Sequence, residues 1–127
     1  LDDLDGEFPR VDPRVETRRH RHGWLAADTT GSGTIRVNAL VHLDLKTGRR
    51  QIHEFGPGDG TSEPVFAPRP GGTEEGDGWL TAVVYRAAED RSDLLIFDAL
   101  DLAKGPIATA QVPRRVPFGF HGNWAAF

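Results

Sequence analysis

The sequence predicts an all-β fold. Turn-forming residues recur along its length, with 15 glycines and 9 prolines among 127 residues. The apolar runs between them are short and rich in β-branched and aromatic residues, which is typical of strands. No segment keeps apolar residues at the 3.6-residue spacing of a helix for three turns, so long amphipathic helices are excluded.

Six strands are predicted along the chain, each bounded by turn-forming residues. They are Val37–Leu45, Gln51–Phe55, Pro64–Ala67, Trp79–Tyr85, Asp93–Ala99 and Pro106–Val112. The clearest hairpin joins Leu40–Leu45 to Arg50–Phe55. Its turn contains Lys46-Thr47-Gly48, where the glycine suits the left-handed backbone that tight turns need.

Short motifs recur about 55 residues apart, which predicts a repeated unit. The corresponding pairs are Glu7–Arg10 with Glu63–Arg69, Gly23–Leu25 with Gly78–Leu80, Leu40–Asp44 with Leu94–Asp98, and Arg50–Phe55 with Pro106–Val112. Phe118–Trp124 would then begin a third unit. Units of this length with four strands each are typical of β-propeller blades. A four- or six-stranded sandwich is the competing fold.

Composition excludes several classes of function. The net charge of −4 argues against a basic nucleic-acid-binding protein. The absence of cysteine excludes disulfides, thiolate catalysis and cysteine-ligated metal sites. No apolar run is long enough for a membrane-spanning helix and no signal peptide is visible, so we expect a cytoplasmic protein. Arginine far outnumbers lysine, which indicates a GC-rich, bacterial coding source.

The chain is expected to be one part of a longer protein. It contains no methionine and starts at Leu1. No linker divides residues 1–127, so we predict a single unit. Two blades and the start of a third cannot close a ring, and the remaining blades are expected to cover the edges and faces that this part leaves open.

Histidine is the only strong ligand type for transition metals in the sequence. His20 and His22 would share one face of a strand, but the surrounding arginines disfavour a cation. His42 and His53 lie on facing strands of the predicted hairpin, where a structural role is favoured. His121 differs, because nearby glycines permit a close approach and aromatic neighbours exclude water.

Glu63 is the carboxylate that most needs a partner. It stands between a glycine-rich loop and an apolar strand. A carboxylate at the edge of an apolar strand must be hydrogen-bonded or paired. An arginine, a backbone N–H and a histidine N–H are the alternatives.

Five motifs in order resemble the carboxy-terminal part of the carotenoid cleavage oxygenase family, which includes lignostilbene and apocarotenoid dioxygenases. They are Glu7–Arg10 (EFPR), Ser62–Pro70 (SEPVFAPRP), Asp77–Tyr85 (DGWLTAVVY), Arg91–Asp98 (RSDLLIFD) and Pro113–Trp124 (PRRVPFGFHGNW). The resemblance implies a seven-bladed propeller. Residues 1–127 would be the carboxy-terminal part of one dioxygenase domain, about two blades plus the start of the closing strand.

The resemblance also implies a metal site. In this family four histidines from different blades bind a non-haem iron(II), and the last of them corresponds to His121. The motif containing Glu63 supplies a carboxylate that orients a ligating histidine, not necessarily His121. Phe118, Phe120 and Trp124 would line or back the substrate site, with packing between blades as the alternative. The other four histidines depart from the family's ligand positions, and His22 stands where an aromatic residue is common.

The implied reaction is cleavage of a conjugated carbon–carbon double bond by O₂, giving two carbonyl products. Its substrate would be a carotenoid, an apocarotenoid or a stilbene. The other three ligands are expected upstream of Leu1, so the isolated part is expected to be inactive. No nucleic-acid partner is expected, and peripheral membrane contact by the complete protein is left open.

The alternative is a non-catalytic propeller fragment that acts as a structural or interaction module. The enzyme hypothesis predicts that His121 and Glu63 both face the propeller axis. The alternative predicts that His121 lies on an outer face or is packed away from any opening.

Overall fold

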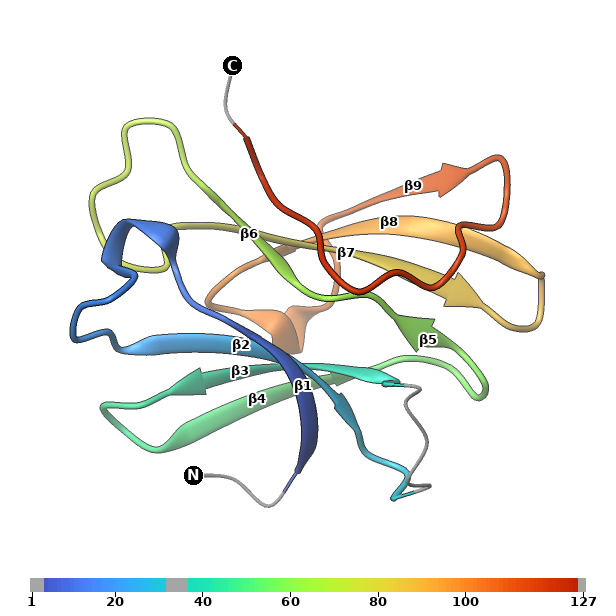
Figure 1. The fold of residues 1–127 in the computed structure, drawn as a ribbon, viewed down its shortest axis with the longest axis horizontal. Helices are drawn as coiled ribbons and strands as arrows, with labels where there is room; N and C mark the ends of the chain where they lie inside the picture. Colours follow the sequence, from blue (N-terminus) through green and yellow to red (C-terminus); the bar gives the residue numbers. More distant parts are fainter. Residues whose placement is uncertain (1–3, 32–36, 126–127) are drawn as a thin grey trace.

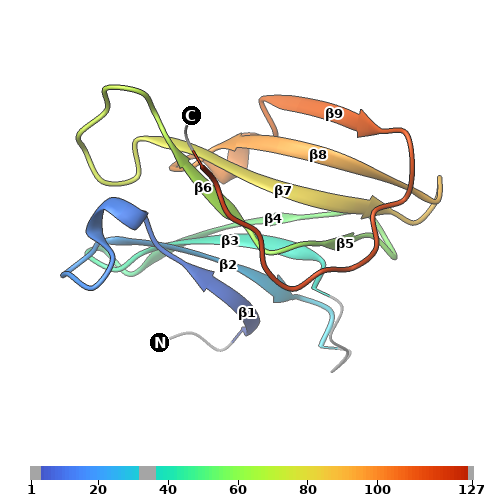
Figure 2. The same cartoon turned by 45° about the horizontal axis from the view of Figure 1, so that its top comes forward.

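The computed structural model describes residues 4–31 and 37–125 and contains two antiparallel sheets packed face to face (Figures 1 and 2). The first sheet comprises β1 (Asp5–Arg10), β2 (His22–Asp28), β3 (Ala39–Asp44) and β4 (Arg49–Glu54). The second comprises β5 (Gly60–Thr61), β6 (Val65–Pro68), β7 (Gly78–Arg86), β8 (Arg91–Asp98) and β9 (Ala108–Val112). Two single 3₁₀ turns, η1 (Pro13–Val15) and η2 (Leu102–Lys104), complete the described elements. The all-β prediction is confirmed.

The two sheets have the same strand order, as the sequence repeat predicts. The first runs β1-β2-β3-β4, and the second runs from β5 and β6, both paired with β7, to β8 and β9. All six predicted strands are present, with ends shifted by a few residues. Three strands were not predicted: β1 contains a proline, β2 begins directly after an arginine-rich stretch, and β5 is only two residues long.

The way the sheets face each other separates a propeller from a sandwich. Trp24 and Trp79 occupy equivalent positions in β2 and β7. Trp24 points into the core between the sheets, whereas Trp79 lies on the face of β7 opposite the buried Leu80. The same face of each sheet therefore points in the same direction, as in successive propeller blades, whereas two equivalent faces would meet in a symmetric sandwich.

The core between the sheets is apolar and fully buried at its centre. Along β7, the alternating residues Leu80, Ala82 and Val84 are buried toward the first sheet. Trp24 is fully buried, stacks on Phe66 with ring centroids 5.0 Å apart, and donates its indole N–H to the Ala99 carbonyl at 2.7 Å. The indole thus fixes the first sheet to the second by packing and by a hydrogen bond.

The carboxy-terminal segment lies outside this core. Residues 113–125 form no strand within the described ranges, so the predicted start of a closing strand stays a prediction. The segment crosses β6 and runs along β5 (Figures 1 and 2). Its Val116 N–H bonds the Ser92 hydroxyl at 2.9 Å, and the Phe118 ring meets the edge of the Tyr85 ring. No helix in the described ranges is long or apolar enough to cross a bilayer.

Candidate functional site

Two interrupted strands meet at one edge of the molecule, formed by β1 in the first sheet and by β5 and β6 in the second. In β1, Glu7 pairs with Ala26 and Arg10 with Trp24, so two residues stand opposite one. Between β5 and β6, three residues stand opposite two, because Thr61 pairs with Val84 and Val65 with Thr81. Both interruptions are β-bulges, which redirect side chains away from the ladder.

Proline explains both bulges. Pro9 lies in the β1 bulge and Pro64 in the β5–β6 bulge. Neither residue can donate an N–H to a ladder, so regular pairing stops where they occur. The bulges turn Arg10 from β1 and Glu63 from the second sheet toward each other.

Glu63 is the centre of the resulting cluster and is only 5% exposed. The Nε–H of Arg10 donates a hydrogen bond to Oε1 of Glu63, and an Nη2–H of Arg10 donates one to Oε2, both at 2.8 Å. The backbone N–H of Gly122 also donates to Oε2, at 2.8 Å. Burial alone would raise the pKa of Glu63, but the Arg10 and Gly122 hydrogen bonds and the contact with His121 hold this pKa below its ordinary value. The carboxylate is therefore ionised and fixed in orientation.

His121 completes the cluster. Its Nδ1 lies 3.4 Å from Oε1 of Glu63, while the side chain is 76% exposed in this chain. The ring also meets Phe8 edge-on, with centroids 5.9 Å apart and planes at 88°. Two of the alternative partners for Glu63, an arginine and a histidine, are thus both present, and the Gly122 N–H supplies the third.

The contact between His121 and Glu63 has the geometry of a metal-binding histidine. With the ring proton on Nδ1 directed at a carboxylate, Nε2 keeps a free lone pair, which is the arrangement that metal-binding histidines use. A neutral imidazole nitrogen suits iron(II). Within residues 4–31 and 37–125, no three histidine or acidic side chains converge on one point as a metal cage. A metal held by Nε2 of His121 would therefore need further ligands from outside the described residues.

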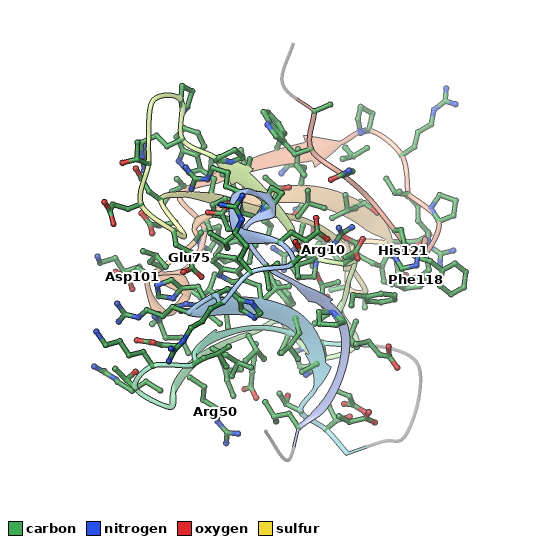
Figure 3. All side chains as sticks on the ribbon, turned by 60° about the vertical axis from the view of Figure 1, so that its left-hand side comes forward. Arg10, Arg50, Glu75, Asp101, Phe118 and His121 are labelled. Atoms are coloured by element: carbon green, nitrogen blue, oxygen red, sulfur yellow. The ribbon has the colours of Figure 1, made fainter. Side chains whose placement is uncertain are left out.

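Aromatic side chains lie close to His121. Phe8, Phe118 and Phe120 border a mainly apolar hollow of about 390 Å³. Phe118 is 52%, Phe120 75% and Trp124 51% exposed, so none of the three is core in this chain. In Figure 3, Arg10, His121 and Phe118 lie on the same side, whereas Glu75 and Asp101 lie on the opposite side.

The other four histidines lie away from this edge or make structural contacts. His20 is exposed, with Nδ1 3.1 Å from the Arg18 carbonyl oxygen, and does not pair with His22. His22 Nδ1 instead lies 2.9 Å from His42 Nε2 in a buried pair. His42 and His53 are diagonal neighbours, because Gln51 stands opposite His42. His53 packs edge-on against Phe97.

Comparison with known proteins identifies the chain's relatives. The sequence model of the family described as retinal pigment epithelial membrane protein matches residues 1–126. The chain belongs to this family. An apocarotenoid-15,15'-oxygenase from Synechocystis sp. is 38% identical over 94% of the chain and 24% of its own length.

Solved structures of the family show the same fold. Cobalt-substituted Synechocystis apocarotenoid oxygenase matches with a TM-score of 0.89 and 37% identity, over 96% of this chain and 26% of its own. Pseudomonas brassicacearum lignostilbene dioxygenase matches with a TM-score of 0.89 and 39% identity, over 97% of this chain and 28% of its own. The chain therefore spans about a quarter of the relatives it matches, and the propeller prediction is confirmed by the family's structures.

Two residues of the cluster around Glu63 and His121, namely Arg10 and Phe8, were not predicted from the sequence. Both lie in the EFPR motif, which was noted as a repeat and as a family motif. The available signal was the proline that EFPR shares with Ser62-Glu63-Pro64. Equivalent prolines in equivalent strands indicate equivalent bulges, which redirect side chains, but they do not identify which side chains meet.

Proposed function

We propose that the complete protein carrying this chain is an iron(II) oxygenase that cleaves a conjugated carbon–carbon double bond with O₂ to give two carbonyl products. In this proposal His121 is one of the iron ligands. The observation that carries it is the Nδ1 of His121 directed at the buried, ionised Glu63. The names of the related oxygenases support the reaction class.

The residues of this chain have separate tasks in the proposed site. Glu63 accepts a hydrogen bond from the Nδ1–H of His121, which fixes the tautomer and aims Nε2 at the metal. Iron, when bound, supplies the activation of O₂. The Gly122 N–H bonds the second carboxylate oxygen of Glu63 and, together with Arg10, holds the carboxylate against the ring.

The substrate proposed is an apolar polyene or stilbene. Phe118 and Phe120 offer two exposed aromatic faces next to His121 and border the same apolar hollow. Such a wall binds a flat conjugated molecule by burying its apolar surface. The remaining blades would supply the other iron ligands and the rest of the substrate site, so this part alone is proposed to be inactive.

The edge that carries the cluster is proposed to face the propeller axis. The β1 and β5–β6 bulges come from two successive blades and meet at this edge. Strands at corresponding positions in every blade would surround one central channel. Ligands from several blades can converge only there. His121 is 76% exposed in this chain, and the proposal takes this exposed side as the one that the remaining blades enclose, whereas the non-catalytic alternative leaves it on an outer face.

The test uses the complete protein, loaded with iron(II) and supplied with stilbenes and apocarotenoids. We expect oxygen uptake matched to the formation of two carbonyl products, and loss of at least a hundredfold in turnover in His121→Ala. His20→Ala, at an exposed histidine outside the cluster, should behave as the original protein. Full activity and iron content in His121→Ala would overturn the assignment, and a complete protein without iron or cleavage would favour the non-catalytic alternative.

A further inference from the structure

Arg10 joins three segments that are far apart in the sequence. Its guanidinium bonds both oxygens of Glu63, 53 residues away, at 2.8 Å. Its Nη2 also donates to the Gly122 carbonyl, 112 residues away, at 2.5 Å. One side chain of the first sheet therefore connects the bulge of the second sheet with the segment that carries His121.

The contacts use the shape of the arginine side chain. Two parallel N–H groups meet two carboxylate oxygens, while a further N–H reaches the carbonyl. Lysine carries a compact ammonium and cannot form the paired contact. The contacts therefore require the planar guanidinium of arginine at position 10, and a positive charge alone does not reproduce them.

The β1 bulge makes a second contact with the same site. Phe8 has φ of 57°, a left-handed conformation that is unfavourable for a bulky side chain. This backbone places the Phe8 ring edge-on against His121. A strained residue two positions before Arg10 thus touches the imidazole directly, while Arg10 acts on it through Glu63.

Removing Arg10 would change the surroundings of His121 in a defined way. Glu63 would keep only the Gly122 N–H and His121 as hydrogen-bond partners among its observed contacts. The Gly122 carbonyl would lose its contact with the first sheet. The carboxylate and the backbone next to His121 would then both be free to shift.

We propose that Arg10 is a positioning residue for the metal site. It fixes Glu63 and the backbone at Gly122, so that His121 keeps Nδ1 toward the carboxylate and Nε2 toward the metal. This inference rests on the proposed function, because it takes His121 as a ligand. It adds that the EFPR bulge of one blade organises a ligand carried by a segment beyond the next blade.

The test measures cobalt(II) binding by the complete, metal-free protein, together with the melting temperature of the metal-free form. We expect Arg10→Gln to bind cobalt roughly tenfold more weakly, the lower end of the range for groups that orient metal-binding histidines. Arg10→Lys should be weakened to a similar degree, because charge alone does not restore the paired contact. Arg10→Lys keeps the charge and the long stem, so it decides the question if Arg10→Gln fails to fold.

Arg21 provides a matched control. Its Nε and Nη2 bond the two Asp44 oxygens at 2.8 and 2.6 Å in the same forked geometry, and its backbone N–H bonds Glu75, on the side away from His121 in Figure 3. Arg21→Gln should leave cobalt affinity unchanged.

The outcomes separate this inference from the proposed function. If the Arg10 variants melt at a lower temperature but bind cobalt as tightly as the original protein, Arg10 has only a structural role and the inference is wrong. If the original protein itself binds no cobalt, or if His121→Ala binds it equally well, the proposed function fails instead.

Discussion

At the scale of single residues, the partner of each histidine decides its chemistry. His121 is exposed and faces a carboxylate, so one ring nitrogen stays available. His22 and His42 are buried and face each other. One Nε2–H of Gln51 donates to the Leu100 carbonyl at 2.8 Å, and the side-chain oxygen of Gln51 accepts from the Ala103 N–H. These two bonds fix the orientation of the amide, so the nitrogen beside Nδ1 of His42 is Nε2, which donates its second N–H to that ring atom. His42 must therefore be neutral, with its proton on Nε2 directed to His22.

The buried pair predicts a pH dependence of stability. Burial, together with the neighbouring His22, lowers the pKa of His42 to about 4. The unfolded chain, with an ordinary histidine pKa near 6.5, therefore takes up this proton first as the pH falls. The contribution of His42 to stability is complete above pH 6.5 and declines toward pH 4, by up to about 3 kcal/mol.

Thermal unfolding of the complete protein between pH 7 and pH 4 checks this prediction. The decline in melting temperature should be shallower in His42→Gln than in the original protein. His20→Gln changes an exposed histidine and should follow the original profile. Parallel profiles for all three proteins would contradict the role assigned to His42.

At the scale of elements, the sequence predicted the strands better than their pairing. The hairpin of β3 and β4 was predicted because its turn and alternation are local signals. β1 was missed because Pro9 and its charged neighbours give no strand pattern, and only pairing with β2 makes it a strand. The His22–His42 contact was missed because it depends on the register between β2 and β3.

The candidate site shows the same limit. His121 and Glu63 were predicted through the family resemblance and the glycine-rich context, and the structure places them side by side. Their connection through Arg10 was not predicted, because it depends on two bulges in different sheets. Proline in both strands indicates interrupted pairing, but it does not reveal that the redirected side chains meet.

At the scale of the whole molecule, the orientation of the sheets predicts that another blade covers the face of the second sheet that carries Trp79. Trp79 is half-buried, and the Arg69 guanidinium packs over its ring, 4.6 Å from the ring centroid. It occupies the position of Trp24, which the next sheet buries completely. A further blade in the complete protein should therefore bury Trp79 as well.

Trp79→Glu tests this expectation. A carboxylate buried between blades without adequate pairing should destabilise the complete protein by about 3 kcal/mol or more, seen as a lower melting temperature or loss of folded protein. Leu45→Glu alters a 45% exposed residue at the β3–β4 turn and should be tolerated. If both variants are equally stable, Trp79 does not lie at a blade interface.

The crystal structure of the complete protein, with anomalous scattering data collected at the edge of the bound metal, tests the central claim most directly. The account predicts an anomalous peak within bonding distance of Nε2 of His121, with Nδ1 facing Glu63 and Arg10 still paired with that carboxylate. A metal bound elsewhere, with the His121 ring turned into solvent, would contradict it.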